Sequence, residues 1–124
     1  MKGIYMETKF NFNSQICTTR EQSELLLSLG LKKETADMVY YRESSIHNWG
    51  ILAKPWRDDF EGSKWYYPAW SLHRLIEMAL RFVLICGISF TFNEDAYEKV
   101  IGIIEYQIKG GYFNKEYLNG TTKD

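Results

Sequence analysis

Residues 64–80 read KWYYPAWSLHRLIEMAL and carry a strand pattern followed at once by a helix pattern. The run Lys64–Tyr67 is rich in β-prone aromatic residues, and Pro68 is expected to stop it because proline cannot donate to a sheet ladder. Ser71 is then expected to be the N-cap of a helix whose apolar stripe is Leu72, Leu75, Ile76, Ala79 and Leu80. Trp70, just before this cap, is placed to pack on Leu75 as a hydrophobic staple.

A second helix is predicted to begin at Thr18 or Thr19. Both residues are followed three positions later by a side chain that can complete a capping box, Glu21 or Gln22. Gly30 is expected to end this helix in a left-handed conformation. The inward face is predicted to carry Leu25, Leu26 and Leu29, with Leu31 folding back on Leu26.

A third helix is predicted from Asn93, its expected N-cap, to Gly110-Gly111. Its buried face is expected to be formed by Tyr97, Val100, Ile101, Ile104 and Ile108. A last helical turn is expected over Asn114–Leu118.

Several shorter segments are predicted around these helices. Strands are expected at Val39–Arg42 and Ile46–Ala53, a period-two strand at Ile88–Phe92 and a short one at Lys9–Phe12. Further expectations are a helical turn over Lys33–Asp37 and a polar turn over Asp58–Ser63. Together these elements predict an α+β fold in which three main helices pack on a small, mainly antiparallel sheet.

The length of 124 residues and the apolar fraction of 45% favour one domain spanning 1–124, with about 1–8 and 120–124 flexible. The first residues lack the apolar core of a signal peptide, and no apolar run reaches the ~20 residues of a membrane helix. Cys17 and Cys86 are isolated, which favours a reducing compartment. We therefore expect a soluble, cytoplasmic protein without a membrane partner.

The charge is balanced along the chain. Fifteen basic and sixteen acidic residues give a formal charge of −1, and neither half carries an excess of one sign. No long-range field therefore attracts nucleic acid, which makes it an unlikely general partner, although a local basic patch is compatible with these numbers.

The polar residues give no catalytic or metal-binding signature. His73 and Glu77 have the spacing of two metal ligands, but an exposed face with local pairing is the favoured interpretation. Asp58, Asp59 and Glu61 lack the alternation of a calcium loop and are interpreted as a solvated turn. We predict no catalytic residue, no metal ligand and no cofactor.

Cys17 is the remaining reactive side chain considered. It lies just before the first helix, where the helix dipole can lower the pKa of a thiol. Neither histidine is tied to it by spacing, and Cys86 is expected to be an inert core residue.

The aromatic residues are unusually concentrated in segment 49–74. All four tryptophans lie there among basic residues, a composition that suits a protein interface or the stacking of single-stranded bases. A core role for Trp65, Tyr67 and Trp70 is the alternative. The residues predicted to bind a partner are Trp49, Trp56, Arg57, Trp65 and Tyr67.

Three groups of residues support a family resemblance. They are Thr18–Ser23 with Leu29–Leu31 and Glu34–Met38, then Pro68–Leu72 with Leu75–Met78, and finally Gly110–Tyr112. Across about half of its length the chain resembles a family of small uncharacterised proteins encoded by prophages and mobile elements of gut bacteria. The resemblance implies a phage-related context and assigns no activity, while residues 44–64 depart from the family pattern.

The function expected from the sequence is that of a non-enzymatic accessory or adaptor protein acting through protein contacts, with a homodimer paired through a sheet edge as one route to such contacts. One alternative is a single-stranded nucleic-acid-binding module that uses segment 49–74. A second is a small metal-dependent hydrolase built from Asp58, Asp59 or Glu61 with His47.

Overall fold

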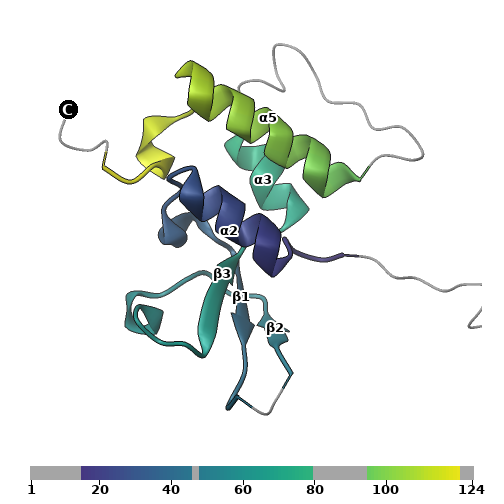
Figure 1. Ribbon diagram of the computed structural model, residues 1–124, viewed down its shortest axis with the longest axis vertical. Helices are drawn as coiled ribbons and strands as arrows, with labels where there is room; N and C mark the ends of the chain where they lie inside the picture. The colour runs from purple at the N-terminus through teal and green to yellow at the C-terminus, as the bar shows by residue number, and fades with distance from the viewer. Residues whose placement is uncertain (1–14, 46–47, 80–94, 121–124) are drawn as a thin grey trace, which may run out of the picture.

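The computed structural model describes residues 15–45, 48–79 and 95–120. In these ranges three α-helices and three strands confirm the predicted α+β class: α2 (Arg20–Ser28), β1 (Met38–Tyr41), β2 (Gly50–Leu52), β3 (Tyr66–Ala69), α3 (Leu72–Met78) and α5 (Ala96–Gly110). Short 3₁₀ helices lie at Lys33–Thr35, Asp58–Phe60 and Lys115–Tyr117. The helices gather at one end of the molecule, and the sheet extends away from them (Figure 1). The strands predicted at Lys9–Phe12 and Ile88–Phe92 lie outside the described residues.

The sheet is antiparallel with the order β2-β1-β3, so β3 is an edge strand. The expectation that Pro68 stops the strand is wrong, because Pro68 lies inside β3 opposite Val39. The amide of Arg42 donates to Trp65 O at 3.2 Å, and bonded pairs alternate along an antiparallel ladder. The nitrogen of Pro68 therefore points away from β1, and the ladder loses no hydrogen bond to the proline.

Helix α2 has the predicted local signals at both ends. The capping box uses the Thr19 register, with Gln22 N donating to Thr19 Oγ1 and Thr19 N donating to Gln22 Oε1, both at 3.0 Å. At the other end Leu31 N donates to Leu26 O and Gly30 N to Leu27 O, which is the Schellman pattern. The inward orientation predicted for Leu25 is wrong, because this side chain is 39% exposed.

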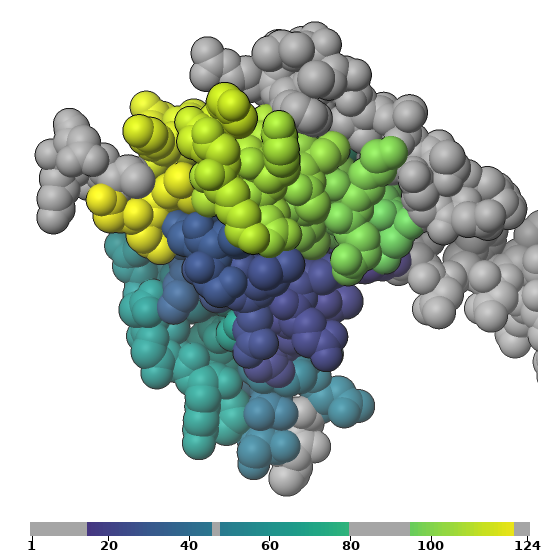
Figure 2. Space-filling view, turned by 45° about the horizontal axis from the view of Figure 1, so that its top comes forward, coloured from purple at the N-terminus to yellow at the C-terminus, as the bar shows by residue number. Residues whose placement is uncertain are grey.

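The core lies between the helices and the inner end of the sheet. Its most buried side chains come from α2, α3 and α5, and include Leu26, Leu75, Val100 and Ile104. Helix α2 lies between α5 and the strands (Figure 2), and Gln22 Nε2 donates to Glu98 Oε2 of α5 at 2.6 Å.

The start of α5 differs from the predicted one. Asp95, rather than Asn93, is the N-cap, because its carboxylate accepts from Tyr97 N at 2.9 Å and from Glu98 N at 3.4 Å. Gly111 ends the helix with φ 80°, as the sequence indicated. Asn93 itself lies outside the described residues.

Trp70 connects the two layers and is completely buried. Its backbone exchanges two hydrogen bonds with Thr18, from Thr18 N to Trp70 O at 2.8 Å and from Trp70 N to Thr18 Oγ1 at 3.1 Å. Its indole Nε1 donates to Thr35 Oγ1 at 2.9 Å. The next residue, Ser71, caps α3 and is itself held by both carboxylate oxygens of Asp37, at 2.8 and 2.6 Å.

We predict that T35V lowers the free energy of unfolding by about 1–3 kcal/mol, because it leaves the buried indole N–H of Trp70 without an acceptor. The hydroxyl of Thr35 also donates to Lys32 O at 2.6 Å, and this bond is lost as well. T35S keeps the hydroxyl and is the matched control. Chemical denaturation of the two variants measures the difference, and a difference below about 0.5 kcal/mol would contradict this role.

Candidate functional site

One face of the sheet carries alternating aromatic and basic side chains. The strand register places residue 40 between residues 51 and 67. Continued by two positions, it places residue 42 between residues 49 and 65. The side chains that share this face are therefore Tyr40, Arg42, Trp49, Ile51, Trp65 and Tyr67. Except for Ile51, which is 39% exposed, they are half-buried.

Two arginines stack on the rings of this face. The guanidinium of Arg42 lies 4.5 Å from the ring centre of Trp49 and 5.9 Å from that of Trp65. Arg20, the first residue of α2, lies 4.6 Å from the ring centre of Trp49 and 4.7 Å from that of Tyr67. The five side chains Tyr67, Arg20, Trp49, Arg42 and Trp65 form a continuous series, which we call the aromatic–cation ladder. Contacts of this kind contribute about 0.5–1 kcal/mol each when exposed and more when desolvated.

A pocket of about 500 Å³ adjoins the ladder. It is bounded by α2, by the 3₁₀ helix Lys33–Thr35, by residues 66–68 of β3 and by the loop 56–64. A volume of this size is typical of sites that bind a small molecule or an anchoring side chain.

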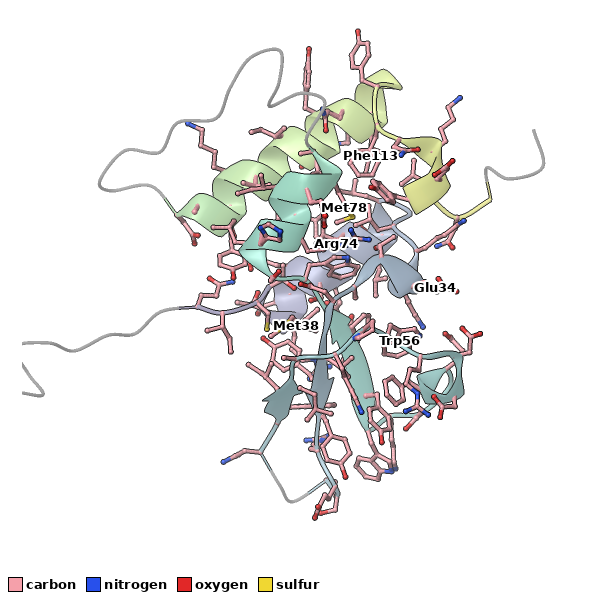
Figure 3. The ribbon with its side chains drawn as sticks, turned by 180° about the vertical axis from the view of Figure 1, so that it is seen from behind. Glu34, Met38, Trp56, Arg74, Met78 and Phe113 are labelled. Carbon is pink, nitrogen blue, oxygen red and sulfur yellow. The ribbon has the colours of Figure 1, made fainter. Side chains whose placement is uncertain are left out.

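Buried rings form the wall of the pocket on the loop side. Phe60 stacks on Tyr66 with ring centres 4.1 Å apart and planes at 11°, and Trp56 meets Phe60 edge-on at 5.3 Å. Trp56 N donates to Ala36 O, which fixes the loop beside the first 3₁₀ helix; Figure 3 shows Trp56 at this position. Lys33 Nζ lies 5.4 Å from the ring centre of Trp56.

The pocket is locally basic although the chain as a whole is not. Its lining includes the cations Arg20, Lys33, Arg42 and Lys64 and one carboxylate, Glu61, which is 2.8 Å from Lys33 Nζ. In the ranges that the structure describes, no carboxylate forms an ion pair with the other three cations.

Arg42 carries a further unsatisfied group. Its Nε atom is buried and has no hydrogen-bond partner among the described residues. A buried donor without an acceptor costs about 1–3 kcal/mol.

The structure brings together four of the five residues predicted to bind a partner. Trp49, Trp65 and Tyr67 belong to the ladder, and Trp56 lies in the wall. Arg57 is elsewhere: its guanidinium is 2.6 Å from an oxygen of Asp59, and it does not line the pocket. Of the three residues proposed as core, Trp70 alone is fully buried.

The sequence did not point to Arg20, Lys33 or Arg42. Arg42 could have been selected from the sequence, because it lies two positions after the aromatic strand residue Tyr40 and therefore shares its face of the sheet. Arg20 and Lys33 had none, since only the placement of α2 and of the first 3₁₀ helix brings them to the pocket.

The acidic residues considered as metal ligands lie on the surface, and three of them, Asp59, Glu61 and Glu77, pair with basic side chains. Asp58, Asp59 and Glu61 are exposed, and Arg74 pairs with Glu77 at 2.9 Å. Within the described ranges no group of three or more His, Cys, Asp or Glu residues is arranged to hold a metal ion. His47 lies outside them.

Cys17 is buried, and its thiol pKa is shifted in the direction opposite to the one that the helix dipole alone would produce. Burial raises the pKa of Cys17, the nearby carboxylate of Asp37 raises it further, and a hydrogen bond with Tyr40 opposes this shift only in part. The thiol therefore stays protonated and hidden near neutral pH. Cys86 lies outside the described residues.

We predict that Cys17 reacts slowly with iodoacetamide in the folded protein, because both its burial and its raised pKa reduce the amount of accessible thiolate. The C86S variant leaves Cys17 as the single thiol. Mass spectrometry should show alkylation at about pH 8 many times slower than in the same variant unfolded by guanidinium. Equal rates in the two states would refute a buried thiol.

We predict that iodide quenches tryptophan fluorescence more strongly than caesium does, because the half-buried Trp49 and Trp65 lie beside unpaired cations. The fraction open to iodide should fall in the W49F/W65F double variant. It should be unchanged in W56F, which removes an indole that is 7% exposed. Equal quenching by caesium, or an equal fall in W56F, would speak against a basic pocket.

Comparison of the chain with protein families, with curated proteins and with solved structures gives no match. Among the described residues there is no helix with the length and apolar character needed to cross a membrane.

Proposed function

We propose that this chain is a non-enzymatic accessory protein that acts by binding a protein partner through the aromatic and basic pocket. One observation carries the proposal. Arg20, Arg42 and Lys64 lie over or beside aromatic rings, have no carboxylate partner in the described chain, and line a pocket of about 500 Å³.

The composition of the lining favours recognition over turnover. Tryptophan, tyrosine and arginine are the residues that contribute most to protein interfaces, where they combine large apolar area with hydrogen bonding. The one carboxylate of the lining is held by Lys33, and the hydroxyl of Ser63 accepts from Trp65 N at 3.1 Å. The carboxylate is therefore paired in the structure, and among the described residues of the lining no histidine or second carboxylate is present to act as a base for the serine.

Binding of single-stranded nucleic acid is the second candidate, since the site combines aromatic rings with cations. It ranks lower because the rings of the ladder already carry guanidinium groups where bases would stack. The phage-related context, the homodimer, the cytoplasmic location and the metal-dependent hydrolase stay predictions from the sequence.

We predict that a photoreactive benzoylphenylalanine placed at Lys64 forms a discrete crosslink to a protein partner in cells that express the chain. Lys64 is exposed and lines the pocket, so a partner seated there comes within reach. The control position is Lys109 on α5, which is also exposed and carries the same charge. Mass spectrometry identifies the adduct, and the purified partner is then tested for binding by calorimetry.

The expected result is an adduct at position 64 that is absent at position 109, followed by binding that W49A weakens. An adduct of twice the chain mass would identify a homodimer as the partner. Identical adducts at both positions, or none at either, would overturn the proposed function.

A further inference from the structure

A ring is at most a weak hydrogen-bond acceptor, so a guanidinium held over one still lacks a strong partner for its N–H groups. The guanidinium carbons of the two ladder arginines, Arg20 and Arg42, lie over the Trp49 ring, 4.6 and 4.5 Å from its centre. Neither donates to a carboxylate in the described part of the chain.

Planar guanidinium edges match the oxygen pairs of carboxylates, with which they form two parallel hydrogen bonds. We infer that the pocket recognises an acidic segment of the partner, with carboxylate side chains seated on Arg20 and Arg42. This inference rests on the proposed function and names the chemistry of the partner.

The spacing of the two arginines suits an extended peptide. Since both guanidinium carbons lie within 5 Å of the same ring centre, they are no more than about 9 Å apart. In an extended chain, side chains on the same face repeat every ~7 Å. Carboxylates two positions apart can therefore reach both arginines at once.

The ladder also reduces the conformational entropy that the two arginines would lose on binding a ligand. A free arginine loses rotamer freedom when it is fixed against a ligand, whereas Arg20 and Arg42 each already contact two rings. This pre-organisation favours binding of a carboxylate ligand.

A nucleic acid is less well matched to this pocket. The neighbouring loop carries Asp58, which is exposed and has no cation partner among the described residues, and its charge repels a continuous phosphate backbone that runs beyond the pocket. An acidic segment short enough to contact only the arginines avoids this repulsion.

The test uses fluorescence anisotropy with a labelled peptide of alternating Glu and Ser, titrated with the full chain at low salt. We expect saturable binding that weakens as salt rises. R42Q and R20Q should each weaken it by about ten-fold or more, because each removes charge-assisted hydrogen bonds. K109Q makes the same change of charge on α5 and should bind as the unmodified chain does.

R42K separates geometry from charge, since it keeps the positive charge and loses the planar pair of donors. It should bind more weakly than the unmodified chain, and circular dichroism of each variant verifies that the fold is retained. Equal binding by R42K and the unmodified chain, or equal losses in K109Q and R42Q, would overturn the inference.

Two further outcomes distinguish this inference from the proposed function. If the peptide does not bind while position 64 still crosslinks a protein, the acidic-segment inference fails and the proposed function stands. If labelled oligothymidylate binds and loses affinity in R42Q while the peptide does not bind, the pocket serves nucleic acid and both proposals fail.

Discussion

The paired contacts of Trp70 with Thr18 and Thr35 hold the two halves of this small structure together. Trp70 follows β3 directly, and its backbone bonds to Thr18 fix where the chain enters α2. Its indole N–H fixes the first 3₁₀ helix through Thr35. A completely buried indole with all its polar groups paired combines a large apolar contribution with a unique orientation. The backbone and the side chain of this one residue therefore fix the start of α2 relative to the sheet.

The position of α2 in turn creates the pocket. Its first residue, Arg20, reaches the aromatic face only because the helix begins beside the inner end of β3. The pleat of the sheet contributes the other half of the arrangement, because it places Arg42 between Trp49 and Trp65 on neighbouring strands. The same tryptophan-rich segment thus provides the core residue Trp70 and the aromatic face beside the pocket, and alternation along the strands separates the two.

The sequence predicted those features that depend on neighbours along the chain. The caps at Thr19 and Ser71 and the reversal at Gly30-Leu31 are local hydrogen-bond patterns, and the structure has all three. The α+β class followed from the change between strand and helix periodicity. Asp95 replaced Asn93 as a cap because both residue types are good caps and only the helix register decides between them.

The candidate site was predictable only in part, and for a physical reason. Trp49, Trp65 and Tyr67 could be selected by composition, but their meeting with Arg20 depends on strand register and on helix placement. These are tertiary properties without a local signal. Arg57 was selected by its proximity to tryptophans in sequence, and it instead pairs with Asp59, two residues away.

The orientation of Pro68 has a consequence for how this chain can assemble. The nitrogen of Pro68 faces outward and carries no hydrogen. The free edge of β3 therefore offers an incoming strand the N–H of Tyr66 but no donor two residues later, at Pro68. Addition of another strand to this edge through main-chain hydrogen bonds is therefore unfavourable. Open-ended assembly of copies of the chain through this edge is unfavourable for the same reason. A partner approaching from this side is therefore selected mainly by side-chain contacts, whereas the opposite edge, along β2, has no proline and directs the N–H of Ile51 outward.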